Sequence, residues 1–250
     1  MTHVVEITSA LLFFSLVFVI PVRGRSRYER FRQEVANDPS ARLRFYRSSL
    51  PPKYVLSLVV IALFFANHRD APGIRLATSA EATAFLMPVL VGMLLGAVIV
   101  KWRLRRPTSR VKLARSLRNI ADLLPRTVGE RRTWVLVSIT AGVTEELIYR
   151  GFVLCVLDHE LPSADTLTLL VLGGLIFGLA HLYQGAKGVV LTGVVGVVLG
   201  TVMISAGLFA AMVIHTLIDL RLLVIPSDFA TQPVDDESKD PDSTGGRTIP

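Results

Sequence analysis

Long apolar stretches divide the chain and are the main feature of its pattern. Apolar residues dominate seven stretches, at positions 4–22, 54–67, 83–100, 133–157, 166–182, 187–204 and 207–225. A helix needs about 20 apolar residues to cross the roughly 30 Å hydrocarbon core of a bilayer, and most of these stretches reach or approach that length. The pattern therefore predicts an all-α, polytopic membrane protein with about seven transmembrane helices. The composition agrees, since 51% of the 250 residues are hydrophobic and the mean hydropathy is +0.52.

Basic residues set the expected orientation. Nine of the 27 Lys and Arg lie in 23–53 and eleven lie in 101–132, whereas 1–22 holds none. The positive-inside rule places both basic segments in the cytoplasm and the N-terminus outside. An even number of crossings must separate the two segments, so the short stretch 54–67 is predicted to span. The membrane thus explains the sequence pI near 10.0, and no nucleic-acid partner is expected.

The same features divide the chain into three regions. Residues 1–132 are predicted to form transmembrane helices with two basic cytoplasmic loops, the second of which contains a helix lying on the inner membrane surface at 108–126. Residues 133–225 are predicted to form a second group of transmembrane helices. Residues 226–250 hold six acidic and two basic residues among Pro, Ser and Gly, which is typical of a disordered cytoplasmic tail.

A few ionisable residues interrupt the apolar stretches of the second half. A charge at the middle of a bilayer costs at least about 2.5–3.5 kcal/mol, so each should face the protein interior or a water-filled cavity. Glu146 and Arg150 are four residues apart on one helical face and are predicted to form a structural ion pair. Glu145 is turned by about 100° from Glu146 and has no partner on its own helix.

The later stretches supply two histidines and a second acid. Gly174 and Gly178 have the spacing that lets another helix approach closely, so His181 on the same face should point into the bundle. His215 and Asp219 are four residues apart and share a face. With Glu145, these residues could form a hydrolytic centre with a general base, an oxyanion site or a metal. The alternative is a set of polar residues that link helices by hydrogen bonds.

Three motifs in this order resemble the CPBP intramembrane proteases, the CAAX protease and bacteriocin-processing family, also called type II CAAX prenyl endopeptidase-like. The resemblance covers roughly 133–225, and the motifs are Glu145-Glu146-x-x-x-Arg150, Phe177-x-x-x-His181 and His215-x-x-x-Asp219. It implies an all-helical fold with the active site in an intramembrane cavity. By analogy, Glu145 and His181 would activate the attacking water, and His215 and Asp219 would hold the oxyanion.

The third motif commonly ends in Asn in that family, whereas Asp219 stands here. An ionised Asp cannot donate a hydrogen bond. Asp219 would therefore have to be protonated, orient His215 or ligate a metal. The family has been described both as metalloproteases and as metal-independent glutamate proteases, and this sequence has no H-E-x-x-H motif. A Zn²⁺ cofactor remains an open alternative, with four candidate ligands: Glu145, His181, His215 and Asp219.

The expected function is intramembrane hydrolysis of a peptide bond in a membrane-associated protein or peptide, near the cytoplasmic face of a prokaryotic plasma membrane. A non-catalytic scaffold or immunity-type member of the same family is the main alternative. A proton- or ion-coupled transporter is a third hypothesis, but residues 1–130 hold no matching inverted half. The sequence names neither the substrate, for which a prenylated CAAX tail is one option, nor the oligomeric state.

Overall fold

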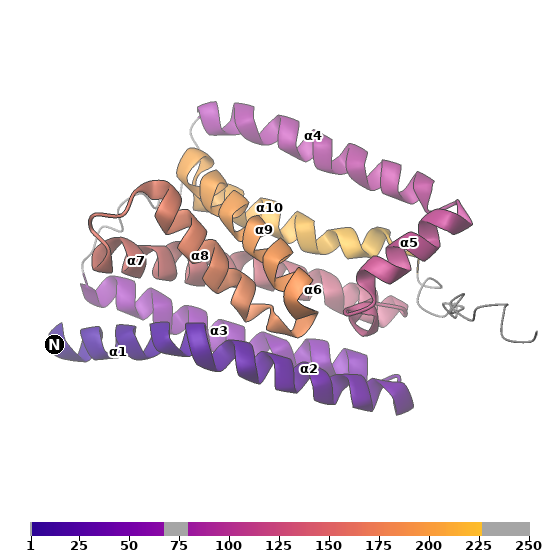
Figure 1. Cartoon of the computed structure of the whole chain (residues 1–250), viewed down its shortest axis with the longest axis horizontal. Coiled ribbons are helices and arrows are strands. Elements are labelled where there is room, and N and C mark those ends of the chain that lie inside the picture. The colour runs from indigo at the N-terminus through magenta and orange to yellow at the C-terminus, as the bar shows by residue number, and fades with distance from the viewer. Residues whose placement is uncertain (1, 68–79, 227–250) are drawn as a thin grey trace, which may run out of the picture.

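The computed structural model describes residues 2–67 and 80–226, and within these ranges the chain forms helices and no strand (Figure 1). The helices up to the end of the predicted N-terminal region are α1 (Thr2–Phe14), η1 (Ser15–Val19), α2 (Ile20–Asn37), α3 (Ala41–Asn67), α4 (Ala80–Arg103), α5 (Pro107–Leu117) and η2 (Ala121–Leu123). The remaining helices are α6 (Val128–Glu146), η3 (Leu147–Val153), α7 (Leu154–Glu160), α8 (Thr166–Ala180), η4 (Leu182–Gln184), α9 (Gly185–Ala206), α10 (Leu208–Leu220) and η5 (Arg221–Val224).

The all-helical membrane fold is confirmed in its main feature. Among the described residues, four helices are long and apolar enough to cross a membrane: His3–Asn37, Ala41–Ala66, Leu86–Arg103 and Leu182–Ala206. The other predicted spans correspond to the continuous run α6–η3–α7 and to the shorter helices α8 and α10, of 15 and 13 residues. A helix of 13 residues is about 20 Å long, which is shorter than the hydrocarbon core of about 30 Å. The count of seven spans and the sidedness of the termini stay predictions.

The first basic segment is not a loop. Residues 23–53, predicted to be a cytoplasmic loop, form most of α2 and the first half of α3, joined only by 38–40. The prediction was wrong because a charged segment need not be a loop: a helix can continue beyond the membrane surface. Lys53, which the prediction placed in that loop, lies in the middle of the 27-residue helix α3.

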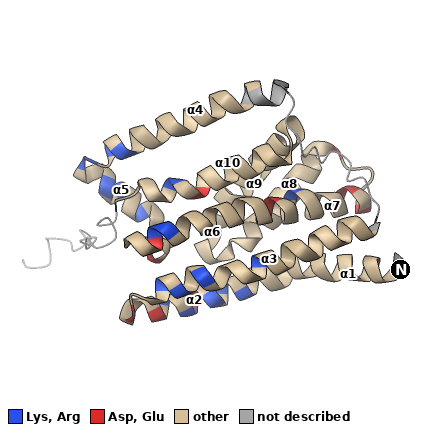
Figure 2. Cartoon of the chain, turned by 180° about the vertical axis from the view of Figure 1, so that it is seen from behind, with Lys and Arg blue, Asp and Glu red and all other residues tan. Residues whose placement is uncertain are grey.

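The second basic segment also contains helices. The predicted surface helix 108–126 begins at Pro107 and ends at Leu117, and a separate 3₁₀ turn follows. Its apolar side packs on neighbouring segments of the protein through Leu113, Ala114 and Leu117. Figure 2 shows that Lys and Arg gather at the end of the molecule where α2 meets α3 and α4 meets α5, so both basic segments lie at one end of the bundle. The predicted tail, apart from Pro226, lies outside the described residues.

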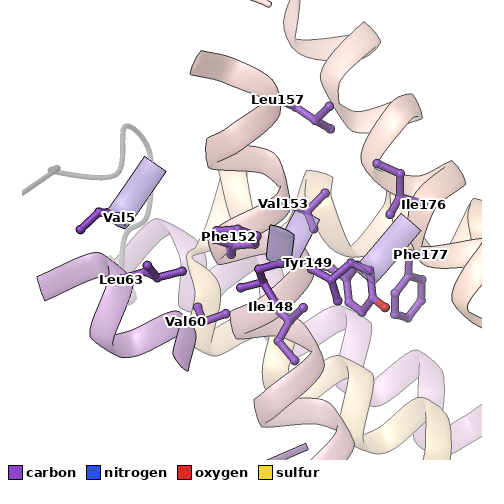
Figure 3. Close-up of a cluster of buried hydrophobic side chains, with 12 residues drawn as sticks. Val5, Val60, Leu63, Ile148, Tyr149, Phe152, Val153, Leu157, Ile176 and Phe177 are labelled. Carbon is purple, nitrogen blue, oxygen red and sulfur yellow. The ribbon is translucent and has the colours of Figure 1, made fainter. Parts of the chain in front are cut away.

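A buried apolar cluster joins the N-terminal helices to the second half of the chain (Figure 3). It brings together side chains from α1, α3, η3, α7 and α8, including Val5, Val60, Ile148, Val153 and Phe177. Val60 and Val153 are completely buried. Helices α1 and α3 therefore share a core with the region that carries the three motifs.

Glycines bring the motif-bearing helices close together. A Cβ atom added at Gly174 would lie 2.8 Å from the carbonyl oxygen of Gly193, and one at Gly178 would lie 2.5 Å from that of Val189. Only residues without a side chain permit this approach of α8 to α9, as their spacing predicted. Gly142 has the same role between α6 and α10, where an added Cβ would lie 2.9 Å from the carbonyl oxygen of Met212.

Short connections then fix the order of α8, α9 and α10. Gly185 and Gly207 have φ angles of 79° and 91°, which glycine adopts without a steric penalty, and they allow the chain to reverse at both ends of α9.

At the start of α8, the Asp165 carboxylate accepts a hydrogen bond of 2.7 Å from the backbone N–H of Thr168. This bond stabilises the charged form and lowers the pKa of Asp165.

Candidate active site

The first motif lies where α6 changes its helical form. A capping box between Thr127 and Glu130 starts α6, and Glu145 and Glu146 are its last two residues. The chain then continues as the π-helix η3, which contains Arg150. Single π-helical turns within longer helices are frequent at functional sites because they change which side chains face inward.

Glu146 is completely buried and links three helices. Arg150 donates a hydrogen bond of 2.8 Å to Glu146 Oε1, so the predicted ion pair is present. Arg150 also donates to the carbonyl oxygen of Gly196 on α9, at 2.9 Å, and its guanidinium lies 4.4 Å from the centre of the Phe177 ring. The pair therefore anchors η3 to α8 and α9.

The same oxygen of Glu146 holds His215, a contact that the sequence did not predict. His215 Nδ1 lies 2.6 Å from Glu146 Oε1. An ionised carboxylate can only accept hydrogen bonds, so Nδ1 carries the hydrogen. This contact fixes the orientation of the ring. Nε2 then lies 3.9 Å from Glu145 Oε2 and 3.9 Å from Asp219 Oδ2.

Asp219, the last residue of the third motif, lies near the C-terminus of α10. The indole N–H of Trp134 donates to the backbone oxygen of Asp219 at 3.1 Å and so ties α10 to α6. The 3.9 Å separations around His215 Nε2 are too long for direct hydrogen bonds. They leave Glu145, His215 and Asp219 as neighbours that a small polar group could bridge.

His181 does not lie within the helix of the apolar stretch, as predicted, but directly after the end of α8. It caps α8 with φ −101° and ψ 24°, and its Nδ1 lies 2.9 Å from the carbonyl oxygen of Phe177. Because a carbonyl oxygen only accepts, Nδ1 donates and Nε2 is left as the nitrogen that can accept a proton. The ring lies 4.8 Å from that of Phe177, and Phe177 meets His215 edge-on at 5.8 Å. The Phe177 ring therefore contacts the rings of both His181 and His215.

Lys53 is the residue of this cluster that sequence reasoning missed. Its Nζ forms an ion pair with Glu145 Oε1, although 92 residues separate the two in the chain. Glu145 was expected to have no partner on its own helix, and the partner that it has comes from another helix, α3. The available signal was the position of Lys53, immediately before an apolar stretch and preceded by Pro51 and Pro52.

The donor atoms do not form a metal site in this arrangement. Among the described residues, no three His, Cys, Asp or Glu side chains form a group that could hold a metal ion. One oxygen of Glu145 is bound by Lys53. This arrangement of side chains therefore does not fit Zn²⁺.

The clearest cavities lie elsewhere. One, of about 340 Å³, is lined by residues that include Arg42, Arg126 and Glu130. The other, of about 570 Å³, lies between α4 and the end of the α10 region and includes Lys101 and Arg131. Neither is lined by the four candidate catalytic residues, so an open intramembrane cavity at those residues stays a prediction.

Comparison with protein families identifies the region that carries the cluster. Residues 128–221 match the family described as Rce1-like, type II CAAX prenyl endopeptidase Rce1-like. This segment is an Rce1-like domain. No curated protein and no solved structure gives a significant match. The match confirms the resemblance to the CPBP family and agrees with the expected extent of 133–225.

The Rce1-like domain contains all seven residues of the three motifs. It covers less than half of the chain and leaves α1 to α5 outside. Lys53 therefore reaches the cluster from a helix beyond the matched segment. The matched family is one of proteases, and four of the described helices are long and apolar enough to cross a membrane.

Proposed function

We propose that this protein is an intramembrane endopeptidase that hydrolyses a peptide bond of a membrane-associated protein or peptide, with a water molecule activated by Glu145 and His181. The observation that carries the proposal is that Glu145, His215 and Asp219 lie together inside the Rce1-like domain, with His181 next to them across the Phe177 ring. The proposed location is the plasma membrane of a prokaryote.

Glu145 is the proposed general base. Lys53 binds Oε1, which leaves Oε2 to accept a hydrogen bond from water. In the attack, Oε2 takes one proton from the water while the water oxygen bonds to the carbonyl carbon of the substrate. His181 would hold the same water through Nε2. When the C–N bond breaks, the proton on Glu145 passes to the leaving amine.

His215 and Asp219 are proposed to stabilise the oxyanion. Lys53 neutralises Glu145 and Arg150 neutralises Glu146. Since these two ion pairs carry no net charge, we propose that a single proton is shared between His215 Nε2 and Asp219. Whichever group holds that proton can donate it in a hydrogen bond to the substrate oxygen as negative charge develops. This account explains how an acidic residue can serve at a position where a donor is needed.

The proposal is tested with the purified protein in lipid vesicles and a library of quenched fluorescent peptides anchored to the membrane by an acyl chain. Cleavage by the parent protein, in the presence and absence of a strong chelator, is compared with that of Glu145→Gln. Hydrolysis that Glu145→Gln abolishes supports the proposal. A parent protein that cleaves no peptide under any condition would favour the non-catalytic scaffold.

A further inference from the structure

We propose that Lys53 is a positioning residue of the active site, which holds Glu145 by one oxygen and presents the other oxygen to the attacking water. This inference rests on the proposed function and extends it to a helix outside the Rce1-like domain. Three observations support it. Helix α3 is held in place by contacts on both sides of Lys53, the charge of Glu145 requires a partner, and the neighbouring Arg150 is already paired with Glu146.

Helix α3 is held firmly against α6 on both sides of Lys53. One residue further on, the hydroxyl of Tyr54 forms a hydrogen bond of 2.9 Å with that of Thr140 on α6. Towards the start of α3, Arg42 lies 3.1 Å from Glu130 in an ion pair that is almost fully buried. Towards its end, Val60 is completely buried in the cluster of Figure 3. Lys53 therefore projects from a fixed backbone.

The charge of Glu145 requires a partner. Only 15% of the Glu145 side chain is exposed, and an uncompensated carboxylate in such surroundings is strongly destabilising. Arg150, which lies one helical turn further on, is committed to Glu146 and to the Gly196 carbonyl. Within the described ranges, Lys53 is the one Lys or Arg that forms an ion pair with Glu145.

The pair also restricts the rotation of the carboxylate. Lys53 binds Oε1, and Oε2 lies 3.9 Å from His215 Nε2. Without the lysine, the carboxylate can turn and bind His215 directly, and it would then no longer face the water. A displacement of about 1 Å in a catalytic group can lower the rate about 100-fold. Loss of Lys53 should accordingly lower kcat and leave KM nearly unchanged.

The opposite role is a brake, in which Lys53 competes with water for Glu145. A brake predicts that removal of the lysine raises kcat. The fixed seat of α3 favours positioning, because a brake must move away from Glu145 in each active molecule.

The experiment compares three variants of the full-length protein in lipid vesicles, using a peptide that the parent cleaves. Lys53→Met removes the charge and keeps the length of the side chain, whereas Lys53→Arg keeps the charge. Lys101→Met is the matched control, since Lys101 lies on α4 and lines a cavity that none of the candidate catalytic residues lines. We expect kcat to fall about 10- to 100-fold in Lys53→Met with KM within about twofold, substantial recovery in Lys53→Arg, and no change in Lys101→Met.

An unchanged or higher kcat in Lys53→Met would overturn the inference and leave the proposed function intact. A parent protein without any hydrolysis would instead remove the proposed function, and the positioning role of Lys53 with it. Thermal unfolding separates the ion pair from its role. If the pair forms, Lys53→Met should lower the unfolding temperature of the parent protein more than it lowers that of the Glu145→Gln variant. Equal decreases in the two proteins would contradict the contact itself.

Discussion

His215 Nδ1 lies 2.6 Å from Glu146 Oε1, so the carboxylate next to the proposed base holds a histidine of the proposed oxyanion site. The same carboxylate oxygen accepts a hydrogen bond from Arg150. Glu146 therefore does more than pair with an arginine on its own helix. It connects the fold of the Rce1-like domain to the orientation of His215, which is proposed to act on the substrate.

The two neighbouring glutamates should respond differently to substitution. Glu145→Gln should abolish hydrolysis and leave the protein folded, because it removes a base whose partner Lys53 is partly exposed. Glu146→Gln should lower both stability and activity, since it removes the counter-charge of the buried Arg150, at a cost of roughly 3–5 kcal/mol, and weakens the hydrogen bond that orients His215. Thermal unfolding and peptide cleavage of both variants provide the check. A stable, fully active Glu146→Gln protein would contradict the network described here.

Close packing of α8 on α9 predicts a large effect at Gly178. Gly178→Ala places a methyl group 2.5 Å from the backbone oxygen of Val189, so the two helices must separate, at a cost of about 1–3 kcal/mol. Gly92→Ala is the matched control, since an added Cβ at that position of α4 meets no atom within 4 Å. The unfolding temperature should fall only in the first variant. Equal stability of the two proteins would show that α8 and α9 do not approach as closely as described.

Asp219→Asn distinguishes the oxyanion role from metal binding. An amide keeps a hydrogen-bond donor of nearly the same shape, so activity should survive if Asp219 and His215 share a proton for the oxyanion. An amide is a much poorer ligand for Zn²⁺, so metal content and activity should fall together if Asp219 ligates a metal. Zinc analysis, chelator treatment and peptide cleavage of parent and variant decide between them. Stoichiometric zinc in the parent, lost along with activity in the variant, would overturn the metal-free mechanism.

The position of both basic segments at one end of the bundle predicts the result of reporter fusions. Reporters at residues 40 and 110 should lie on the same side of the membrane, in the cytoplasm, and a reporter within 158–165 should lie on the opposite side. Reporters at 40 and 110 on opposite sides would show that α3 and α4 do not both cross the membrane.

Local spacing was enough to predict part of the site. The contact between Glu146 and Arg150 follows from a separation of four residues on one helix, and the approach of α8 to α9 follows from the two glycines at the same spacing. Both features depend on residues that are close in sequence, where helical geometry determines which side chains share a face.

Contacts between distant helices could not be predicted in this way. The hydrogen bond between Glu146 and His215 depends on how α10 seats on α6, and the ion pair between Lys53 and Glu145 depends on the length of α3. Because 23–53 was predicted to be a loop, Lys53 was not expected to lie near Glu145. The position of His181 after the end of α8 was missed because the apolar stretch continues through the cap, so hydropathy gives no signal of the helix end.

The central claim is that water, activated by Glu145, attacks a peptide bond. The most direct measurement is cleavage of a membrane-anchored peptide in ¹⁸O-labelled water, followed by mass spectrometry of the N-terminal product. The account predicts one ¹⁸O atom in the new carboxyl group with the parent protein and no product with Glu145→Gln. Labelled product formed at the same rate by Glu145→Gln, or no product from the parent protein with any peptide, would contradict it.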